Sequence, residues 1–167
     1  MPIGSTIGEL WRKSRFLTPY LRNTLWERGY AIDTLATAVP WSKVISTAAA
    51  ITTSLRRGLQ DEGERVLVFA HLSHIYRDGA SIYVTFLFRQ AEHPELTLHR
   101  WRALKHTASQ VILAHGGTIS HQHGVGRDHA PYLSAEKGRL GMKALESLRR
   151  TFDPKGILNP GILLEDG

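Results

Sequence analysis

Two stretches rich in β-branched and aromatic residues lie close together in the middle of the chain, and they constrain its fold most strongly. Residues 65–71 and 80–88 are rich in Val, Ile, Tyr and Phe, the residue types that favour strands. Arg77-Asp78-Gly79 lies between them and is typical of a turn. The sequence therefore predicts a β-hairpin at the centre of the fold.

Segments on both sides of this hairpin complete the pattern. Residues 31–37 alternate as a strand does, and residues 43–59 have helical periodicity with Ser42 as the expected N-cap. A second helix is expected from Pro94 to about residue 115, followed by a short strand at residues 118–120. This order of elements predicts an α+β fold of the ferredoxin-like, split βαβ type. One antiparallel sheet would then carry both long helices on one face and leave the other face available for a ligand or partner.

Helical segments are expected to extend this core at both ends. Residues 7–27 have helical periodicity, and Pro19 predicts a break near Thr18 because proline disrupts a helix and restricts the residue before it. An amphipathic helix is expected at residues 134–151.

Composition narrows the kinds of function. The 167 residues have an ordinary globular content of 42% hydrophobic and 22% charged residues. The net charge of +6 comes from scattered basic residues, which favours an anionic small molecule over nucleic acid as partner. Cysteine is absent, and no apolar run reaches the roughly 20 residues that cross a bilayer. With no apolar signal segment at its start, the chain is expected to be cytoplasmic, and contact with a membrane surface stays open.

Histidines form the clearest candidate site. Five of the nine histidines lie between His106 and His129, and three of them fall in the segment 120–129. Glycines at 116, 117, 124 and 126 would let the backbone approach a planar or phosphorylated ligand closely. Metal binding lacks a convincing third ligand, so hydrogen bonding in a polar pocket is the preferred interpretation. Gly124-Val125-Gly126 lacks a third glycine and precedes the expected helix by several residues, which does not fit a dinucleotide fingerprint.

A second candidate is Tyr83 in the second strand of the hairpin. Alternation places Tyr83 on the same face as Ser81 and Thr85. A phenol acts as a general base only if its pKa falls from about 10 toward neutrality, which requires about 4 kcal/mol from nearby cations. Simple packing in the core is the alternative for a tyrosine on a strand.

Two motifs carry a resemblance to a known family. Residues 116–126 resemble the flavin-facing motif of FAD-linked oxidases of the vanillyl-alcohol-oxidase type, and residues 152–161 resemble their C-terminal signature. Residues 18–22, 41–42 and 74–83 resemble the branch of this family that exchanges an acyl for an alkyl group on dihydroxyacetone phosphate in ether lipid biosynthesis.

The resemblance implies a domain arrangement and a cofactor. Residues 1–167 correspond to the C-terminal cap domain, with a core at about 31–121 and a flavin-facing loop and helix at 121–167. The cofactor is expected to be FAD, held largely by an FAD-binding domain that lies outside this chain. The substrate is expected to be a phosphorylated or carboxylated small molecule or lipid.

The resemblance also implies roles for individual residues. Tyr83 is expected to be the catalytic base, and Arg22 is expected to bind the anionic part of the substrate. His121 and His123 are expected to stabilise charge, and Arg127 is a second, weaker candidate for anion binding. The residues expected near the cofactor are Gln122, Gly124 and Asn159.

Departures from the family pattern leave alternatives open. Gln122 replaces the middle one of three consecutive histidines, and Tyr83 and Gln122 occupy two positions that supply ligands in metal-dependent relatives. We therefore predict no metal. A hydroxy-acid or glycerol-3-phosphate-type dehydrogenase is one alternative. A chain that is inert until an FAD domain joins it is another, and its uncovered sheet face would then expose apolar side chains.

Overall fold

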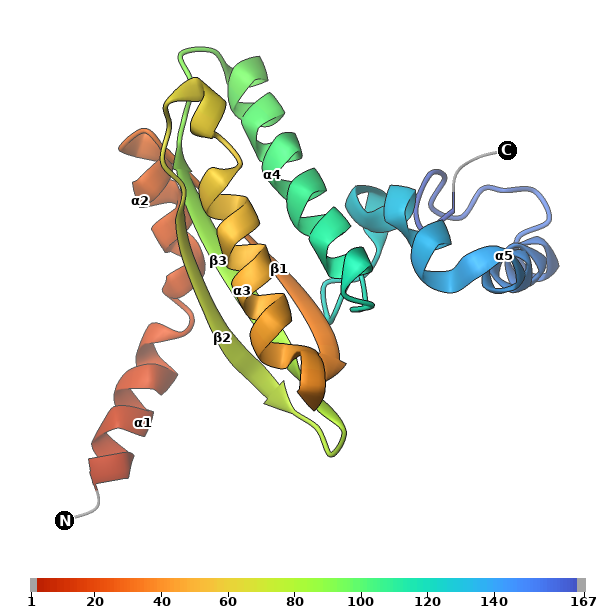
Figure 1. Cartoon of the computed structure of the whole chain (residues 1–167), viewed down its shortest axis with the longest axis horizontal. Helices are drawn as coiled ribbons and strands as arrows, with labels where there is room; N and C mark the ends of the chain where they lie inside the picture. Colours follow the sequence, from red (N-terminus) through yellow and green to blue (C-terminus); the bar gives the residue numbers. More distant parts are fainter. Residues whose placement is uncertain (1–2, 165–167) are drawn as a thin grey trace.

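The fold is built on a three-stranded antiparallel sheet with strand order β1-β3-β2. The computed structural model describes residues 3–164. Strands β1 (Tyr30–Pro40), β2 (Leu67–Ile75) and β3 (Gly79–Arg89) form the sheet, and β2 and β3 make the predicted hairpin. The α+β class is therefore confirmed (Figure 1).

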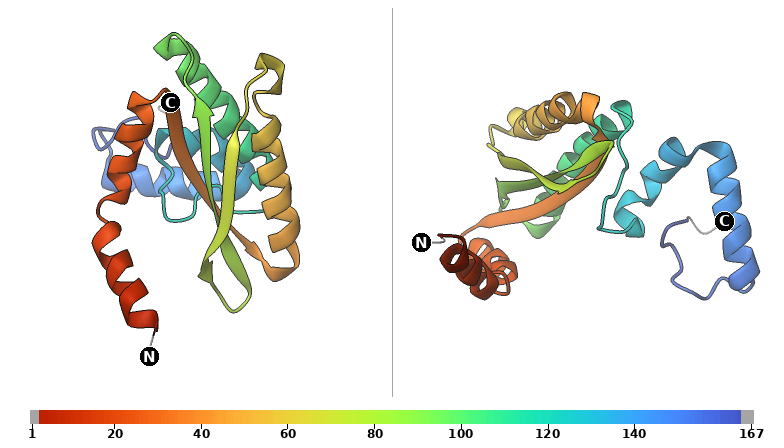
Figure 2. Two further views of the ribbon diagram at one scale, coloured as in Figure 1. Left: turned by 90° about the vertical axis from the view of Figure 1, so that its left-hand side faces the viewer. Right: turned by 90° about the horizontal axis from the view of Figure 1, so that it is seen from below.

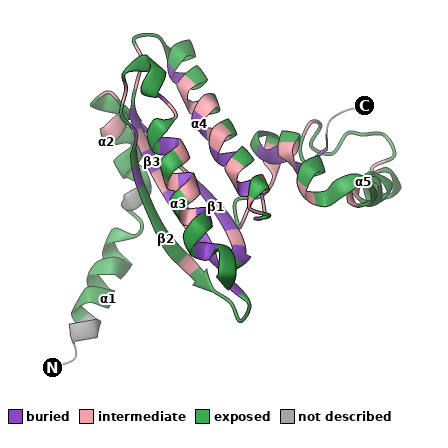
Figure 3. Ribbon diagram, viewed as in Figure 1, coloured by how far each residue is buried: buried purple, intermediate pink, exposed green. Residues whose placement is uncertain are grey.

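Two helices cover one face of the sheet, as predicted. Helices α3 (Trp41–Arg57) and α4 (Pro94–Ala114) pack against each other and lie on the same side of the sheet (Figure 2). Ile82, Val84 and Phe86 alternate along β3 and are almost completely buried toward these helices. Figure 3 shows that the buried residues concentrate in the layer between the sheet and the two helices. The apolar core therefore lies on one side, and the other face of the sheet is free to form a site.

The strand predicted at residues 118–120 is wrong, so the sheet lacks the fourth strand of the ferredoxin-like arrangement. The segment does run antiparallel beside the free edge of β1: the Thr118 N–H donates to the Ala38 carbonyl at 3.3 Å and the His121 N–H donates to the Ala36 carbonyl at 3.0 Å. Gly116 before it and Gln122 after it both have positive φ angles, of 69° and 68°. These turns keep the extended run too short to be a strand.

Helices precede and follow the core in the sequence, with boundaries that differ from the prediction. Helix α1 (Ile3–Ser14) is separated from α2 (Leu21–Glu27) by the short 3-10 helix η1 (Thr18–Tyr20), which confirms the break near Thr18. Helix α5 (Gly126–Phe152) begins eight residues earlier than the 134 expected, and Gly138 interrupts it with φ 65° and ψ 174°. The helix therefore follows Gly124-Val125-Gly126 directly, as a dinucleotide-binding fingerprint requires. The third glycine of that fingerprint is still missing.

The start of α3 also differs in detail. Ser42 lies inside the helix, Pro40 occupies the N-cap position, and no side chain caps this end. The indole N–H of Trp41 instead donates to the Arg77 carbonyl at 3.1 Å, and this bond ties the helix start to the β2–β3 turn.

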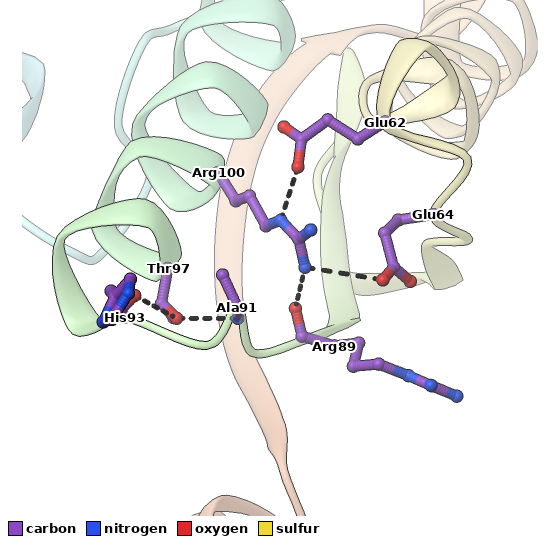
Figure 4. Close-up of polar contacts among 7 residues, drawn as sticks. All are labelled: Glu62, Glu64, Arg89, Ala91, His93, Thr97 and Arg100. Atoms are coloured by element: carbon purple, nitrogen blue, oxygen red, sulfur yellow. Dashed lines mark hydrogen bonds and ion pairs between the residues drawn. The ribbon is translucent and has the colours of Figure 1, made fainter.

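The guanidinium of Arg100 fixes the N-terminal part of α4. Arg100 of α4 donates to Glu62 of the short helix η2 (Gln60–Glu62) at 2.6 Å and to the Arg89 carbonyl at the end of β3 at 2.9 Å (Figure 4). Thr97 accepts a hydrogen bond from the Ala91 N–H at 2.9 Å, in the connection between β3 and α4. These contacts fix α4 relative to the sheet that carries the site.

Candidate functional site

The candidate site lies on the open face of the sheet, opposite helices α3 and α4. Tyr83 is the central residue of this face, and its neighbours across the two flanking strands are Ala36 of β1 and His71 of β2. The rings of Tyr83 and His71 lie 5.3 Å apart. Because strand residues alternate between faces, Tyr83 points away from the buried Ile82 and Val84.

The loop that follows residue 120 crosses this open face and contacts all three strands. Its backbone is bonded to β1 through His121, as described above. The His123 ring meets Tyr83 of β3 edge to face, with ring centroids 5.6 Å apart. The His121 ring lies 5.5 Å from the ring of His74 on β2. The three residues expected to be catalytic, Tyr83, His121 and His123, therefore lie in one region of the molecule.

Two residues with positive φ allow the loop to turn tightly. Gln122 and Gly124 have positive φ angles of 68° and 73°, which reverse the chain twice within a few residues. The Ser120 hydroxyl donates to the Gly124 carbonyl at 2.6 Å and closes the loop. A non-glycine residue at positive φ is uncommon, so Gln122 sits in a strained conformation that the surrounding contacts maintain.

A groove of about 1070 Å³ runs from this loop along the free edge of β1. Tyr83 and His123 line it at one end, and Arg22 of α2 lines it from the side. Arg15 and Lys105 add positive charge to its walls. Apolar side chains complete the lining: Pro19, Leu21, Trp26, Ile32, Phe88, Leu98, Trp101 and Val125. The groove therefore offers both cationic and apolar surface to a ligand.

Lys105 is held in the groove wall by a cluster that the sequence analysis missed. The Trp101 indole N–H donates to Asp33 Oδ2 at 2.6 Å, and Lys105 Nζ lies 3.5 Å from the same oxygen. Lys105 also donates to the Thr34 carbonyl at 3.1 Å. Asp33, a charged residue inside the strand predicted at residues 31–37, was the available signal for this cluster, because a partly buried carboxylate needs a partner.

Two residues of the hairpin, His74 and Tyr76, flank His121. Tyr76 Oη lies 2.7 Å from His121 Nε2, within hydrogen-bonding distance. Gln122 Nε2 lies 3.1 Å from His74 Nε2, so the glutamine amide is directed at β2. Among the described residues, His121 Nδ1 is buried and has no hydrogen-bond partner.

Burial disfavours the protonated form of both loop histidines. It is the largest cause that lowers the pKa of His121, and the rings of His74 and His123 lower it further. It also lowers the pKa of His123, with contributions from Lys105 and His129 and an opposing contribution from Asp33. Both imidazoles are therefore less readily protonated than free histidine.

Two expected site residues lie elsewhere. Arg127 Nη2 donates to the Pro160 carbonyl at 3.3 Å, and the Asn159 carbonyl accepts the Ile162 N–H at 3.2 Å. Neither residue lines the groove beside Tyr83, whereas Gly124 does. The α5 N-terminus directs Arg127 toward the C-terminal turn, and this geometry could not be read from the Gly-Val-Gly register.

The described residues form neither a metal cluster nor a membrane-spanning helix. Within residues 3–164, no group of three or more histidine and carboxylate side chains is arranged to hold a metal ion. In the same part of the chain, no helix is both long and apolar enough to cross a bilayer.

An α+β sheet covered by helices on one face, with a cationic and aromatic groove along the free edge of β1, defines a ligand-binding domain. The chain belongs to the family described as FAD linked oxidases, C-terminal domain, which matches residues 5–163. Family membership implies FAD as the cofactor of the full enzyme.

Individual relatives support this membership. The chain is 30% identical over 162 residues to an alkyldihydroxyacetonephosphate synthase of Trypanosoma brucei brucei, covering 97% of this chain and 26% of the relative. It is 50% identical over 46 residues to the glycolate oxidase subunit GlcD of Bacillus subtilis, covering 28% of this chain and 10% of that protein. A solved alkyldihydroxyacetonephosphate synthase shares the fold, with a TM-score of 0.62 and 23% identity over 91% of this chain and 24% of its own. The chain thus spans about a quarter of the synthases it resembles.

Proposed function

We propose that this chain is the substrate-covering domain of an FAD-dependent enzyme that exchanges an acyl for an alkyl group on dihydroxyacetone phosphate. The similarity to alkyldihydroxyacetonephosphate synthases supports this reaction class. The observation that carries the proposal is the shared groove, where the edge-to-face pair Tyr83–His123 and the guanidinium of Arg22 face one space. This shared lining supports Tyr83 as a base and Arg22 as an anion-binding group that act on one ligand.

The residues of the open face fit a planar cofactor. A Cβ added to Gly124 would meet nothing within 4 Å, so the loop has room beside it. The buried Nδ1 of His121, which has no partner among the described residues, supplies an unused polar atom. Tyr83, His71 and His123 supply flat rings along the same face. A bound flavin would supply the electrophilic ring at which the substrate reacts.

This chain's own residues have distinct tasks in that reaction. Arg22 binds the phosphate of the substrate and orients it along the groove. Tyr83 removes the proton from the carbon that carries the acyloxy group. The loop histidines stabilise charge that develops on the substrate oxygens: His123 lines the groove and donates to it directly, and His121 supports it from the adjacent position in the loop.

The FAD-binding domain is proposed as the partner that covers the remaining apolar surface. Leu67 and Phe69 on β2 are each 55% exposed, and Leu10, Trp11 and Leu17 near the N-terminus are exposed to a similar extent. Apolar surface of this kind is typical of an interface. On this proposal the isolated chain retains little FAD. Absorbance of the purified chain at the flavin wavelengths measures the FAD that it retains.

The decisive experiment replaces Tyr83 in the flavin-bearing enzyme that contains this domain. Tyr83→Phe is expected to lower kcat by at least about 100-fold, the usual contribution of a positioned general base, while flavin content is unchanged. Tyr30→Phe on the adjacent strand is the matched control and is expected to leave kcat unchanged. Turnover of Tyr83→Phe within threefold of the wild type would remove Tyr83 from the reaction.

A dehydrogenase is the second candidate, and the match to the glycolate oxidase subunit favours it. Anaerobic mixing of the enzyme with its substrate separates the two reactions. Net bleaching of the flavin supports dehydrogenation, whereas exchange of the acyl group for an added alcohol without net bleaching supports the synthase reaction.

A further inference from the structure

A carboxylate on α5 holds the short segment that leads into the histidine loop. Glu136 Oε2 accepts the Ile119 N–H at 2.7 Å, and Oε1 accepts the Thr118 hydroxyl at 3.1 Å. The Glu136 side chain is only 16% exposed, so both bonds form largely away from solvent. Lys137 Nζ lies 2.7 Å from Oε1 and balances the charge.

The segment held by Glu136 is also bonded to β1 on its other side. The Thr37 hydroxyl donates to the Thr118 carbonyl at 2.8 Å, in addition to the two backbone bonds from Thr118 and His121 to β1. Residues 118–121 are therefore clamped between the edge of the sheet and one side chain of a different helix. His121 ends this clamped segment, and His123 follows two residues later.

An ionised carboxylate suits this task because it only accepts hydrogen bonds and has two oxygens for two donors. Burial raises the pKa of Glu136, but hydrogen bonds from Lys137, from the Ile119 N–H and from Thr118 outweigh it, so the pKa lies below its usual range. Lys137 is the charged group that faces Glu136, and Thr118 and Ile119 are neutral. The carboxylate is thus charged at neutral pH and keeps both donors occupied.

We infer that Glu136 is a positioning residue, which holds residues 118–119 so that His121 and His123 stay over Tyr83 and the hairpin. Its effect on catalysis rests on the function proposed above, whereas its effect on the loop does not. Without the carboxylate, the Ile119 N–H loses its acceptor and the segment keeps only its bonds to β1. The loop histidines then shift away from the tyrosines that they contact.

The first test uses NMR on the 167-residue chain. Glu136→Ala is expected to speed hydrogen exchange of the Ile119 amide by about tenfold or more, because a bond to a charged acceptor is lost. It is also expected to move the His123 ring proton shifts toward those of free histidine as the edge-to-face contact with Tyr83 is lost. Glu136→Gln keeps one acceptor and is expected to give an intermediate result.

Two further variants keep this test decisive. Glu146→Gln on the exposed side of the same helix is the matched control and is expected to change neither signal. Thr118→Val removes one donor to Glu136 and is expected to weaken Ile119 protection even if Glu136→Ala fails to fold. Unchanged Ile119 exchange and His123 shifts in Glu136→Gln and Thr118→Val overturn the inference.

The second test separates this inference from the proposed function. In the flavin-bearing enzyme, Glu136→Ala is expected to lower kcat at least about tenfold while KM changes less than threefold, because Arg22 still binds the substrate. Glu136→Gln is expected to restore part of the loss. If the NMR signals move and kcat does not, Glu136 still positions the loop, and the roles proposed for the histidines are wrong.

Discussion

Gly117 occupies a position where even one added methyl group meets buried atoms. It connects the end of α4 to the segment that runs beside β1, and it is buried. A Cβ at this position would lie 2.5 Å from Thr37 Oγ1, 3.1 Å from Val39 Cγ1 and 3.2 Å from Ile112 Cγ2. Thr37 is itself completely buried and donates to the Thr118 carbonyl at 2.8 Å. We therefore expect Gly117→Ala to push Thr37 out of its hydrogen bond.

The expected loss of stability follows from two contributions. Overpacking of a filled core costs about 1–3 kcal/mol. Loss of the Thr37 hydrogen bond adds about 0.5–1.5 kcal/mol. Gly117→Ala should therefore lower the free energy of unfolding by about 2–4 kcal/mol. Because the displaced segment leads to His121, kcat of the full enzyme should fall as well.

Urea unfolding followed by circular dichroism measures this loss, with a double-mutant cycle as the check. In a Thr37→Ala background the nearest atom is absent, so Gly117→Ala should cost at least about 1 kcal/mol less than in the wild type. Gly8→Ala is the control: an added Cβ meets nothing within 4 Å, and alanine favours the helix in which Gly8 lies, so this variant should lose no stability. A loss below about 0.5 kcal/mol, or an equal loss in both backgrounds, would refute the steric argument.

Three further predictions concern protonation, the core and the α4 anchor. NMR titration should give pKa values for His121 and His123 below the ordinary value of about 6.5, and values at or above it would contradict the burial argument. Because these histidines take up protons more readily in the unfolded chain, the free energy of unfolding should decrease as the pH falls below about 6.5. Phe86→Ala should lower the free energy of unfolding by about 3–5 kcal/mol, because the ring is fully buried. A loss under about 1 kcal/mol in urea unfolding would show that the core relaxes to fill the cavity left by the ring. Arg100→Met should lower the free energy of unfolding by about 1–2 kcal/mol, because the Arg89 carbonyl loses its donor while the more exposed Glu62 regains contact with water. An unchanged melting temperature would show that Arg100 does not anchor α4.

Local patterns in the sequence were sufficient for most of the secondary structure. The alternation along residues 80–88 and the turn residues before them depend only on neighbours in the chain, and the hairpin formed as predicted. The break before α2 follows from Pro19 alone. The motifs around residues 116–126 and 152–161 were enough for the family, which the match over residues 5–163 confirms.

The strand expected at residues 118–120 shows where local patterns fail. Its residue types suit a strand, but a strand also needs a partner over several residues. Here β1 supplies only two backbone bonds, and the Ile119 N–H donates to Glu136 instead. The competing acceptor lies 17 residues further along the chain, so no local window contains it.

The sequence by itself determined the elements, the family and the residue types available for chemistry, because each of these depends on short-range order. The tertiary structure alone decided which of those residues meet. It brought Tyr76 to His121 across 45 residues and Asp33 to Trp101 across 68 residues. It also directed Arg127 away from the groove toward Pro160. Long-range contacts of this kind are selected by packing of the whole sheet and its helices, which no pattern along the chain records.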